Sequence, residues 1–296
     1  MSKSISKLNT LLFSVLALCA FAANSILARL ALGSGDIDAA SFTVVRLLSA
    51  ILMLTILIKV RNKGNLTPNI KPKSSWFAAL MLFVYAGSFS FAYLSLDTGI
   101  GALVLFAAVQ ITMVISNYFK GNRLQLVEFL GLIIAFSGFL YLIFPSLSKP
   151  SLQGFILMTV SGIAWAFYTL KGQGASDPLS ATNINFARTL PFIVILFIFS
   201  FLSGLLNYTW PGLLLAIMSG SLASALGYYC WYLALAKLSI TVASVIQLSV
   251  PIIAALGGVI FMAEPISFDF IIACSLVSTG ILLVVLANYR KTKIAC

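Results

Sequence analysis

The sequence contains no histidine and very few charged residues, and these shortages exclude most soluble folds. Only 8% of its 296 residues are charged, against roughly a quarter in an average globular chain. Hydrophobic residues make up 61%. At about 20 apolar residues per bilayer crossing, the length allows ten helical spans with short connections. The sequence therefore predicts an all-α polytopic membrane protein with ten transmembrane helices.

The same shortages argue against an enzyme. Intramembrane catalysis needs a nucleophile with a base, a metal cluster or paired aspartates at depth. The chain has only 7 acidic residues, and Glu128, Glu264 and Asp269 fall at the ends of apolar runs. The four cysteines are scattered without the spacing of a metal site or a disulfide framework. We therefore expect no enzymatic activity, no metal and no cofactor, and a proton relay through a buried carboxylate is disfavoured.

Long uncharged stretches mark the predicted spans. The first follows Lys3 and Lys7 and is too long for the apolar core of a secretory signal, so we expect it to remain as a span. A turn-forming segment at 207–212 divides the longest uncharged stretch. Two of the spans are interrupted by a charge, the second by Arg46 and the seventh by Arg188. The ten stretches are 8–28, 39–58, 74–96, 98–119, 129–148, 150–170, 179 to the turn, the turn to 236, 238–263 and 270–289.

The basic residues predict the orientation, because they gather in cytoplasmic loops. With the N-terminus in the cytoplasm, fourteen basic residues fall on that side, whereas only Lys149 falls on the other. The fourteen are Lys3, Lys7, Lys59, Arg61, Lys63, Lys71, Lys73, Lys120, Arg123, Lys171, Lys237, Arg290, Lys291 and Lys293. We expect a multi-pass protein of the cell (inner) membrane with both termini cytoplasmic. This asymmetry explains the net charge of +11 without a nucleic-acid partner.

An internal repeat relates the two halves of the chain. A constant offset of 142 residues pairs Arg29 with Lys171, Arg46 with Arg188, Ser137 with Thr279 and Gly138 with Gly280. Five is an odd number of spans, so halves at 1–148 and 149–296 cross the membrane in opposite senses. Inverted repeats of this kind are the architecture of secondary transporters. The alternative is that a duplication only built a stable bundle.

One segment is similar to a known family. The residues Gln247-Leu248-Ser249-Val250-Pro251, followed by Gly257-Gly258 and then Glu264-Pro265-Ile266, resemble the ninth-helix signature of EamA-type transporters in the drug/metabolite transporter superfamily. The resemblance implies ten spans in two inverted repeats. It also implies a central cavity lined by spans one, three, four, six, eight and nine, with spans five and ten used for packing. The first half departs from the pattern, with Val109 where the proline would stand and Asn122 where the glutamate would stand.

Polar and aromatic residues within these spans are the candidate binding residues, because polar groups in lipid should face the bundle interior. The candidates are Asn24, Tyr85, Phe89, Gln110, Thr112, Trp165, Tyr168, Tyr228, Gln247 and Ser249. The stripe of Tyr85, Phe89 and Tyr93 also fits simple helix packing. We expect Tyr93, Trp231 and Tyr232 to anchor at the membrane interface.

Three further residues have two interpretations each. Arg46 and Arg188 could contact an anionic group of a substrate, or they could be structural, snorkelling to headgroups or pairing with helix carbonyls. Pro251 removes a backbone hydrogen bond and is predicted to bend span nine. That bend could serve gating or be a static kink.

Together these features predict a secondary transporter that exports an amino acid or a similar small metabolite by alternating access. Its expected partners are a small-molecule solute and the lipid bilayer, and a homodimer is compatible with the architecture. The alternatives are a sugar-phosphate, nucleotide-sugar or drug transporter of the same fold, and a passive channel.

Overall fold

The structure, a computed structural model, describes residues 7–62, 75–119, 126–143, 151–173, 175–238, 246–247 and 249–294. Within these ranges the regular structure is helical apart from an isolated bridge between Ile37 and Tyr208. The elements are α1 (Lys7–Gly33), α2 (Ala39–Arg61), α3 (Trp76–Ala92), α4 (Thr98–Phe119), α5 (Leu126–Ile143), α6 (Ser151–Gly172), α7 (Pro178–Ala187), α8 (Leu190–Leu202), α9 (Trp210–Met218), η2 (Ser219–Leu226), α10 (Gly227–Leu235), α12 (Ser249–Met262) and α13 (Phe268–Ile294).

Several of these helices are long and apolar enough to cross a bilayer, so the chain is a multi-pass membrane protein of the all-α class, as predicted. Six helical segments meet this criterion: Leu8–Gly33, Ala39–Arg61, Thr98–Ser116, Leu152–Gly172, Pro178–Leu202 and Trp210–Leu235. Four shorter apolar helices are Trp76–Ala92, Leu126–Gly138, Ser249–Met262 and Phe268–Val284. The count of ten spans and the inverted repeat stay predictions, and the boundary at 148 lies outside the described residues.

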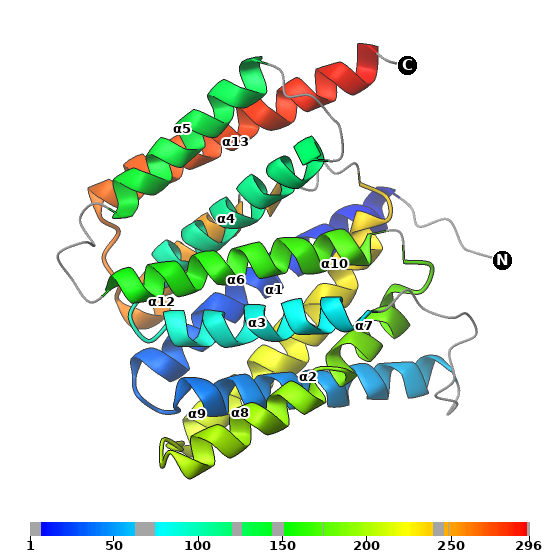
Figure 1. The fold of residues 1–296 in the computed structure, drawn as a ribbon, viewed down its shortest axis with the longest axis vertical. Helices are drawn as coiled ribbons and strands as arrows, with labels where there is room; N and C mark the ends of the chain where they lie inside the picture. The colour runs from blue at the N-terminus through cyan, green and yellow to red at the C-terminus, as the bar shows by residue number, and fades with distance from the viewer. Residues whose placement is uncertain are drawn as a thin grey trace.

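The helices run between two ends of one bundle (Figure 1). We call the end where α1 begins and α2, α6, α10 and α13 finish the termini end, and the opposite end the far end. Lys59, Arg61, Lys171 and Lys237 lie at the termini end, whereas Asp36, Asp38, Asp97, Glu264 and Asp269 lie in or beside the far-end loops. Several basic residues used for the predicted orientation, among them Lys63, Lys120 and Arg123, fall outside the described residues.

Two predicted spans are interrupted helices. The seventh breaks between α7 and α8, because the ring of Pro191 clashes with the carbonyl group four residues earlier, at Ala187, and so ends α7 there. The eighth contains the π-helix η2 between α9 and α10. Gly220 in η2 packs so closely on α2 that a side chain there would collide with the carbonyl oxygen of Arg46. These irregular segments lie beside the candidate site described below.

The helices α5 and α13 pack side by side at one edge of the bundle (Figure 1). Gly131 and Gly280 allow this contact, because a Cβ on either glycine would collide with the backbone of the other helix. The hydroxyl of Tyr141 donates a hydrogen bond of 2.8 Å to Asp269. The expectation that spans five and ten serve packing agrees with this close pair.

Pro251 is buried in α12 (Ser249–Met262), and residues 246–247 before it are also helical. Leu248 is outside the described residues, so the predicted bend of span nine, and its use in gating, stay predictions.

Candidate functional site

Arg46 lies in α2, about 10 Å along the helix from its first residue at 1.5 Å per residue, and only 1% of it is exposed. Its guanidinium group donates from Nη2 to the hydroxyls of Tyr85 (3.0 Å) and Tyr228 (3.2 Å), and from Nε to Ser224 Oγ (3.1 Å). Nη1 is buried and has no hydrogen-bond partner among the described residues. An arginine at membrane depth costs about 2.5–3.5 kcal/mol even on the milder scales. The burial of Arg46 therefore has a free-energy cost that other interactions in the fold must offset.

Aromatic rings surround this cation. The Cζ atom of Arg46 lies 4.7 Å from the ring centre of Phe89 and 5.2 Å from that of Tyr85. Trp165 packs against Tyr85 (4.9 Å between ring centres) and Tyr228 (4.6 Å). Cation–π attraction to desolvated rings offsets part of the cost of burial. We call Arg46, Tyr85, Phe89, Trp165 and Tyr228 the Arg46 cluster.

Asn24 joins the cluster through η2. Its amide nitrogen donates to Ser224 Oγ (3.2 Å), the same hydroxyl that accepts from Arg46, and its amide oxygen accepts from Ser219. Ser224 was not among the predicted residues, because a serine in an apolar run resembles any small helix-packing residue. The π-helical turn that presents it has no clear signal in the sequence.

A small void lies next to the cluster. Its volume is about 10 Å³, close to the room that one water occupies. Side chains of α1, α3, α4 and α6 line it: Phe21, Ser25, Tyr85, Phe89, Leu105, Phe106 and Trp165. In this conformation the space beside the cluster is therefore too small for a metabolite.

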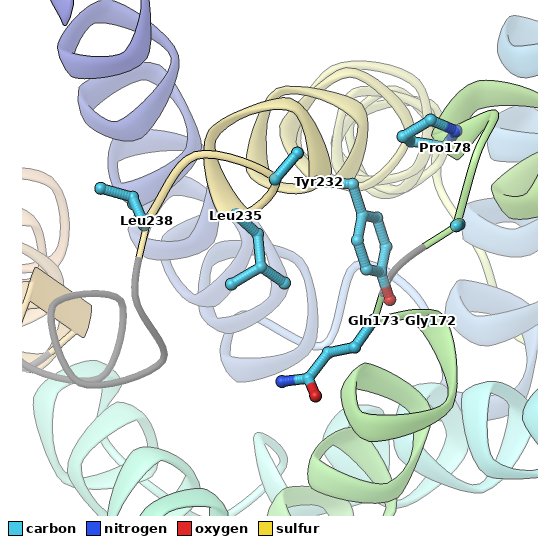
Figure 2. A pocket seen from close by; sticks show the side chains of 8 residues that line it. Gly172, Gln173, Pro178, Tyr232, Leu235 and Leu238 are labelled. Atoms are coloured by element: carbon cyan, nitrogen blue, oxygen red, sulfur yellow. The ribbon is translucent and has the colours of Figure 1, made fainter. Parts of the chain in front are cut away.

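A larger cavity of about 370 Å³ opens at the termini end (Figure 2). It is lined by Gly172, Gln173, Ala175, Pro178, Tyr232, Leu235, Ala236 and Leu238. The ring of Tyr232 projects toward Gly172 and Gln173 in Figure 2. We call this space the termini-end cavity.

Two tyrosines lead from this cavity toward the cluster. Tyr168 lies 6.3 Å from Tyr232 and 5.5 Å from Trp165, measured between ring centres. Both tyrosines also line a narrow space shared with Thr182 and Asn185. The hydroxyls of Tyr168 and Tyr232 are buried and lack a well-formed hydrogen bond among the described residues. A row of packed, uncharged aromatic side chains thus lies between the termini-end cavity and the Arg46 cluster.

The structure brings together six of the ten predicted binding residues. These are Asn24, Tyr85, Phe89, Trp165, Tyr168 and Tyr228. The hydroxyls of Thr112 and Ser249 instead donate to the backbone of their own helices, at Ala108 and Ile246. Gln110 and Gln247 are each 3% exposed, and their part in binding stays a prediction.

The expected interface anchors are not at an interface. Tyr93, Trp231 and Tyr232 are 0%, 1% and 6% exposed, so none of them faces lipid headgroups. That expectation was wrong because an aromatic residue near the end of a span looks the same in sequence whether it faces lipid or a neighbouring helix. Tyr93 packs on Phe89, and Trp231 packs on Phe21.

Arg188 occupies a different environment from Arg46, although the repeat relates the two. It follows the last residue of α7, where its N–H bonds to the carbonyl of Ile184 (2.9 Å). Its guanidinium carbon lies 5.5 Å from the ring centre of Trp76, and the side chain is half-buried. Arg188 is outside the Arg46 cluster. The cation of the cluster, Arg46, comes from span two, which the resemblance did not include among the cavity-lining spans.

Ion pairs join the loops at the far end. Arg29 contacts Asp97 (3.3 Å) and Glu264 (3.1 Å), and Glu264 also accepts from the N–H of Thr98 (2.9 Å) at the start of α4. This contact is favourable because a helix N-terminus attracts a carboxylate. One arginine of α1 therefore holds the loops before α4 and α13 together.

A second far-end connection joins the loop before α2 to the loop before α9. The N–H of Asp38 donates to the Asn207 carbonyl (2.8 Å), and the N–H of Thr209 donates to the Asp36 carbonyl (2.7 Å). The Asp38 carboxylate accepts from the N–H of Asn207 (2.9 Å). Both ion pairs and backbone hydrogen bonds thus join the described loops of the far end.

Among the described residues, an ion pair also forms at the termini end. Arg61 at the end of α2 donates to both carboxylate oxygens of Asp177, at 2.7 and 2.8 Å. Asp177 caps the N-terminus of α7. Partial burial would raise the pKa of Asp177, but hydrogen bonds from Arg61 and Ser180 outweigh it and hold the pKa below its ordinary value.

Comparisons with known proteins agree with this architecture. A model described as the EamA-like transporter family matches residues 152–286. An uncharacterized protein of Pseudomonas aeruginosa is 45% identical over 87% of this chain and 88% of its own length. An uncharacterized transporter of Archaeoglobus fulgidus is 30% identical over 64% of this chain and 68% of its own.

The fold has a counterpart among solved structures. One crystal structure of a protein, 15% identical in sequence, superposes with a TM-score of 0.66 over 96% of this chain and 100% of its own. At that identity the likeness concerns the fold alone. The family match and the two relatives decide the assignment: the chain belongs to the EamA-like transporter family.

Proposed function

We propose that this transporter is a ten-span secondary carrier that moves a small organic metabolite, such as an amino acid, by alternating access. The six long and four shorter apolar helices support ten spans. In this proposal the halves 1–148 and 149–296 are inverted repeats that enclose a shared chamber, with the Arg46 cluster at its centre.

The single observation that carries the proposal is the difference between the two ends. The cavity of about 370 Å³ opens at the termini end, with the packed rings of Tyr232 and Tyr168 between it and the cluster, whereas Arg29 and its partners join the described loops of the far end. A cavity at one end and joined loops at the other fit one of the two states of a carrier. A passive channel would instead need a route open at both ends.

The charge distribution supports an orientation. Lys59, Arg61, Lys171 and Lys237 at the termini end fit a cytoplasmic face in the cell membrane. The cavity then opens to the cytoplasm, as loading of a substrate for export requires.

Counterflow into proteoliposomes tests this function. Vesicles preloaded with unlabelled amino acids, sugars, nucleotides or cationic drugs are given the same labelled compound outside. A carrier shows saturable uptake that is stimulated by substrate on the far side of the membrane. Linear, unsaturable uptake that preloading does not change would contradict the proposal and indicate a pore.

A further inference from the structure

Arg46 differs from the other arginines that make ionic or hydrogen-bonded contacts in the structure. Arg29 and Arg61 are partly exposed and pair with carboxylates. Arg46 is the more deeply buried residue, yet its partners among the described residues are hydroxyl oxygens and aromatic rings. A buried cation without a counter-charge is normally neutralised by an anion that joins it.

The guanidinium group of Arg46 has a donor nitrogen available for that anion. Nε and Nη2 are engaged, whereas Nη1 is buried and lacks a hydrogen-bond partner among the described residues. A guanidinium fork matches a carboxylate with two parallel hydrogen bonds, and such charge-assisted bonds are the strong ones. The hydroxyl of Tyr228 accepts from Nη2 and donates to the hydroxyl of Tyr85 (3.0 Å). The Tyr85 hydroxyl, which accepts from both, could turn its own proton to the same anion.

The side chains around Arg46 indicate the chemistry of the rest of the ligand. Phe89, Trp165 and Phe21 provide aromatic surface beside the small void. The void is too small for a metabolite in this conformation, so these rings must separate when a ligand enters. The side chains of Tyr232 and Tyr168, between the termini-end cavity and the cluster, are also aromatic and uncharged. This combination suits one anionic group on a small apolar or aromatic body.

We infer that Arg46 binds the carboxylate of the transported solute, and that the substrates are small monocarboxylates with an apolar or aromatic body, apolar amino acids included. The inference rests on the proposed carrier function and specifies its substrate class. It also assigns different roles to the two arginines that the repeat relates, since Arg188 lies outside the cluster.

Ligand-dependent thermal unfolding of the purified full-length protein tests the inference. The probes are sodium phenylacetate, sodium isovalerate, L-phenylalanine and L-leucine at constant ionic strength, each compared with its uncharged carboxamide or, for the amino acids, its amino-acid amide. We expect saturable stabilisation by carboxylates, since a ligand that binds only the folded state raises the melting temperature. Each amide should bind at least tenfold more weakly, because it cannot form the charged pair.

Variants separate the two arginines. Arg46→Gln should weaken carboxylate binding at least tenfold, and Arg46→Lys, which keeps the charge without the fork, should weaken it less. The matched control Arg188→Gln should stay within twofold of the wild type. If Arg46→Gln does not fold, the comparison of acids with amides on the wild type and on Arg46→Lys still decides.

Four results would overturn the inference: equal binding of acids and amides, unchanged binding by Arg46→Gln, absence of stabilisation by every carboxylate, or equal stabilisation by inorganic phosphate. The last would assign Arg46 to phosphate groups, whether of lipid or of solute. Counterflow of uncharged or phosphorylated solutes would still leave the carrier function intact. Failure of counterflow with every class of compound would instead contradict the proposed function itself.

Discussion

The two ends of the helix bundle are held in different ways. At the far end, Arg29 pairs with Asp97 and Glu264. A short backbone connection joins the loop of Asp36 to that of Thr209 as well. At the termini end, the Arg61–Asp177 pair stands beside open space, including the cavity of about 370 Å³. Within the described residues, several loops are therefore joined at the far end, whereas the Arg61–Asp177 pair joins α2 to the start of α7 at the termini end.

This difference between the two ends indicates which contacts must change during transport. If the far end is to open, Arg29 must release the loops before α4 and α13 together, because it holds both. If the termini end is to close, Tyr232 and its neighbours around the cavity must come together. The predictions below test the two ends separately, from the largest expected effect to the smallest.

Blocking the termini-end cavity should have the largest effect. In a variant without the four native cysteines, Gln173→Cys places a thiol at the cavity wall. Modification with a benzyl methanethiosulfonate should reduce counterflow more than tenfold, because the adduct occupies the route to the cluster. The control is Ser34→Cys, on an exposed far-end turn, where modification should change the rate less than twofold. Equal rates before and after modification of Gln173→Cys would remove this cavity from the pathway.

Opening the far end should have an intermediate effect. Arg29→Gln leaves Asp97 and Glu264 without their cation. For partly buried pairs we expect a loss of about 1–2 kcal/mol, which shifts the conformational balance by about tenfold. A single cysteine at Ser267 should then react several-fold faster with an impermeant reagent added at the far side. Arg29→Lys should retain most of the closure, and an unchanged rate in Arg29→Gln would show that these pairs do not hold the far end.

Breaking the termini-end pair should have the smallest effect. Asp177→Asn removes a partly exposed ion pair, so we expect counterflow to change twofold or less. Because the pKa of Asp177 is depressed in the folded protein, the pair is fully present above the ordinary aspartate value of about 3.9 and is lost only as the pH falls through the depressed value. The ratio of wild-type to variant rates should therefore be constant between pH 8 and pH 5. A ratio that changes within this range would contradict the assignment.

The sequence predicted much of the helix layout because the apolar runs are long and their ends carry charges. Residues 39 and 98, for example, are predicted starts that coincide with the starts of α2 and α4. The breaks in the seventh and eighth spans were missed. Pro191 lies inside an unbroken apolar run, and η2 depends on the close contact between Gly220 and α2, which only the tertiary structure creates.

The candidate site could be predicted only in part. Aromatic residues at helical spacing, such as Tyr85 and Phe89, were identified because their period places them on one face. Arg46 was recognised as a possible anion contact, but the sequence could not distinguish it from Arg188, since the offset of 142 makes the two equivalent. Near-complete burial and hydrogen bonds to the hydroxyls of Tyr85, Tyr228 and Ser224 distinguish Arg46. These properties arise from helices far apart in the chain.

The most direct test of alternating access is a pair of spin-label distances measured in the same protein, one across each end. Labels at Ser34 and Ser267 report on the far end, and labels at Gln173 and Leu238 report on the termini-end cavity. The account predicts that Arg29→Gln lengthens the far-end distance and shortens the termini-end distance together. A longer far-end distance with an unchanged or longer termini-end distance would show that the two ends move independently, which contradicts the account.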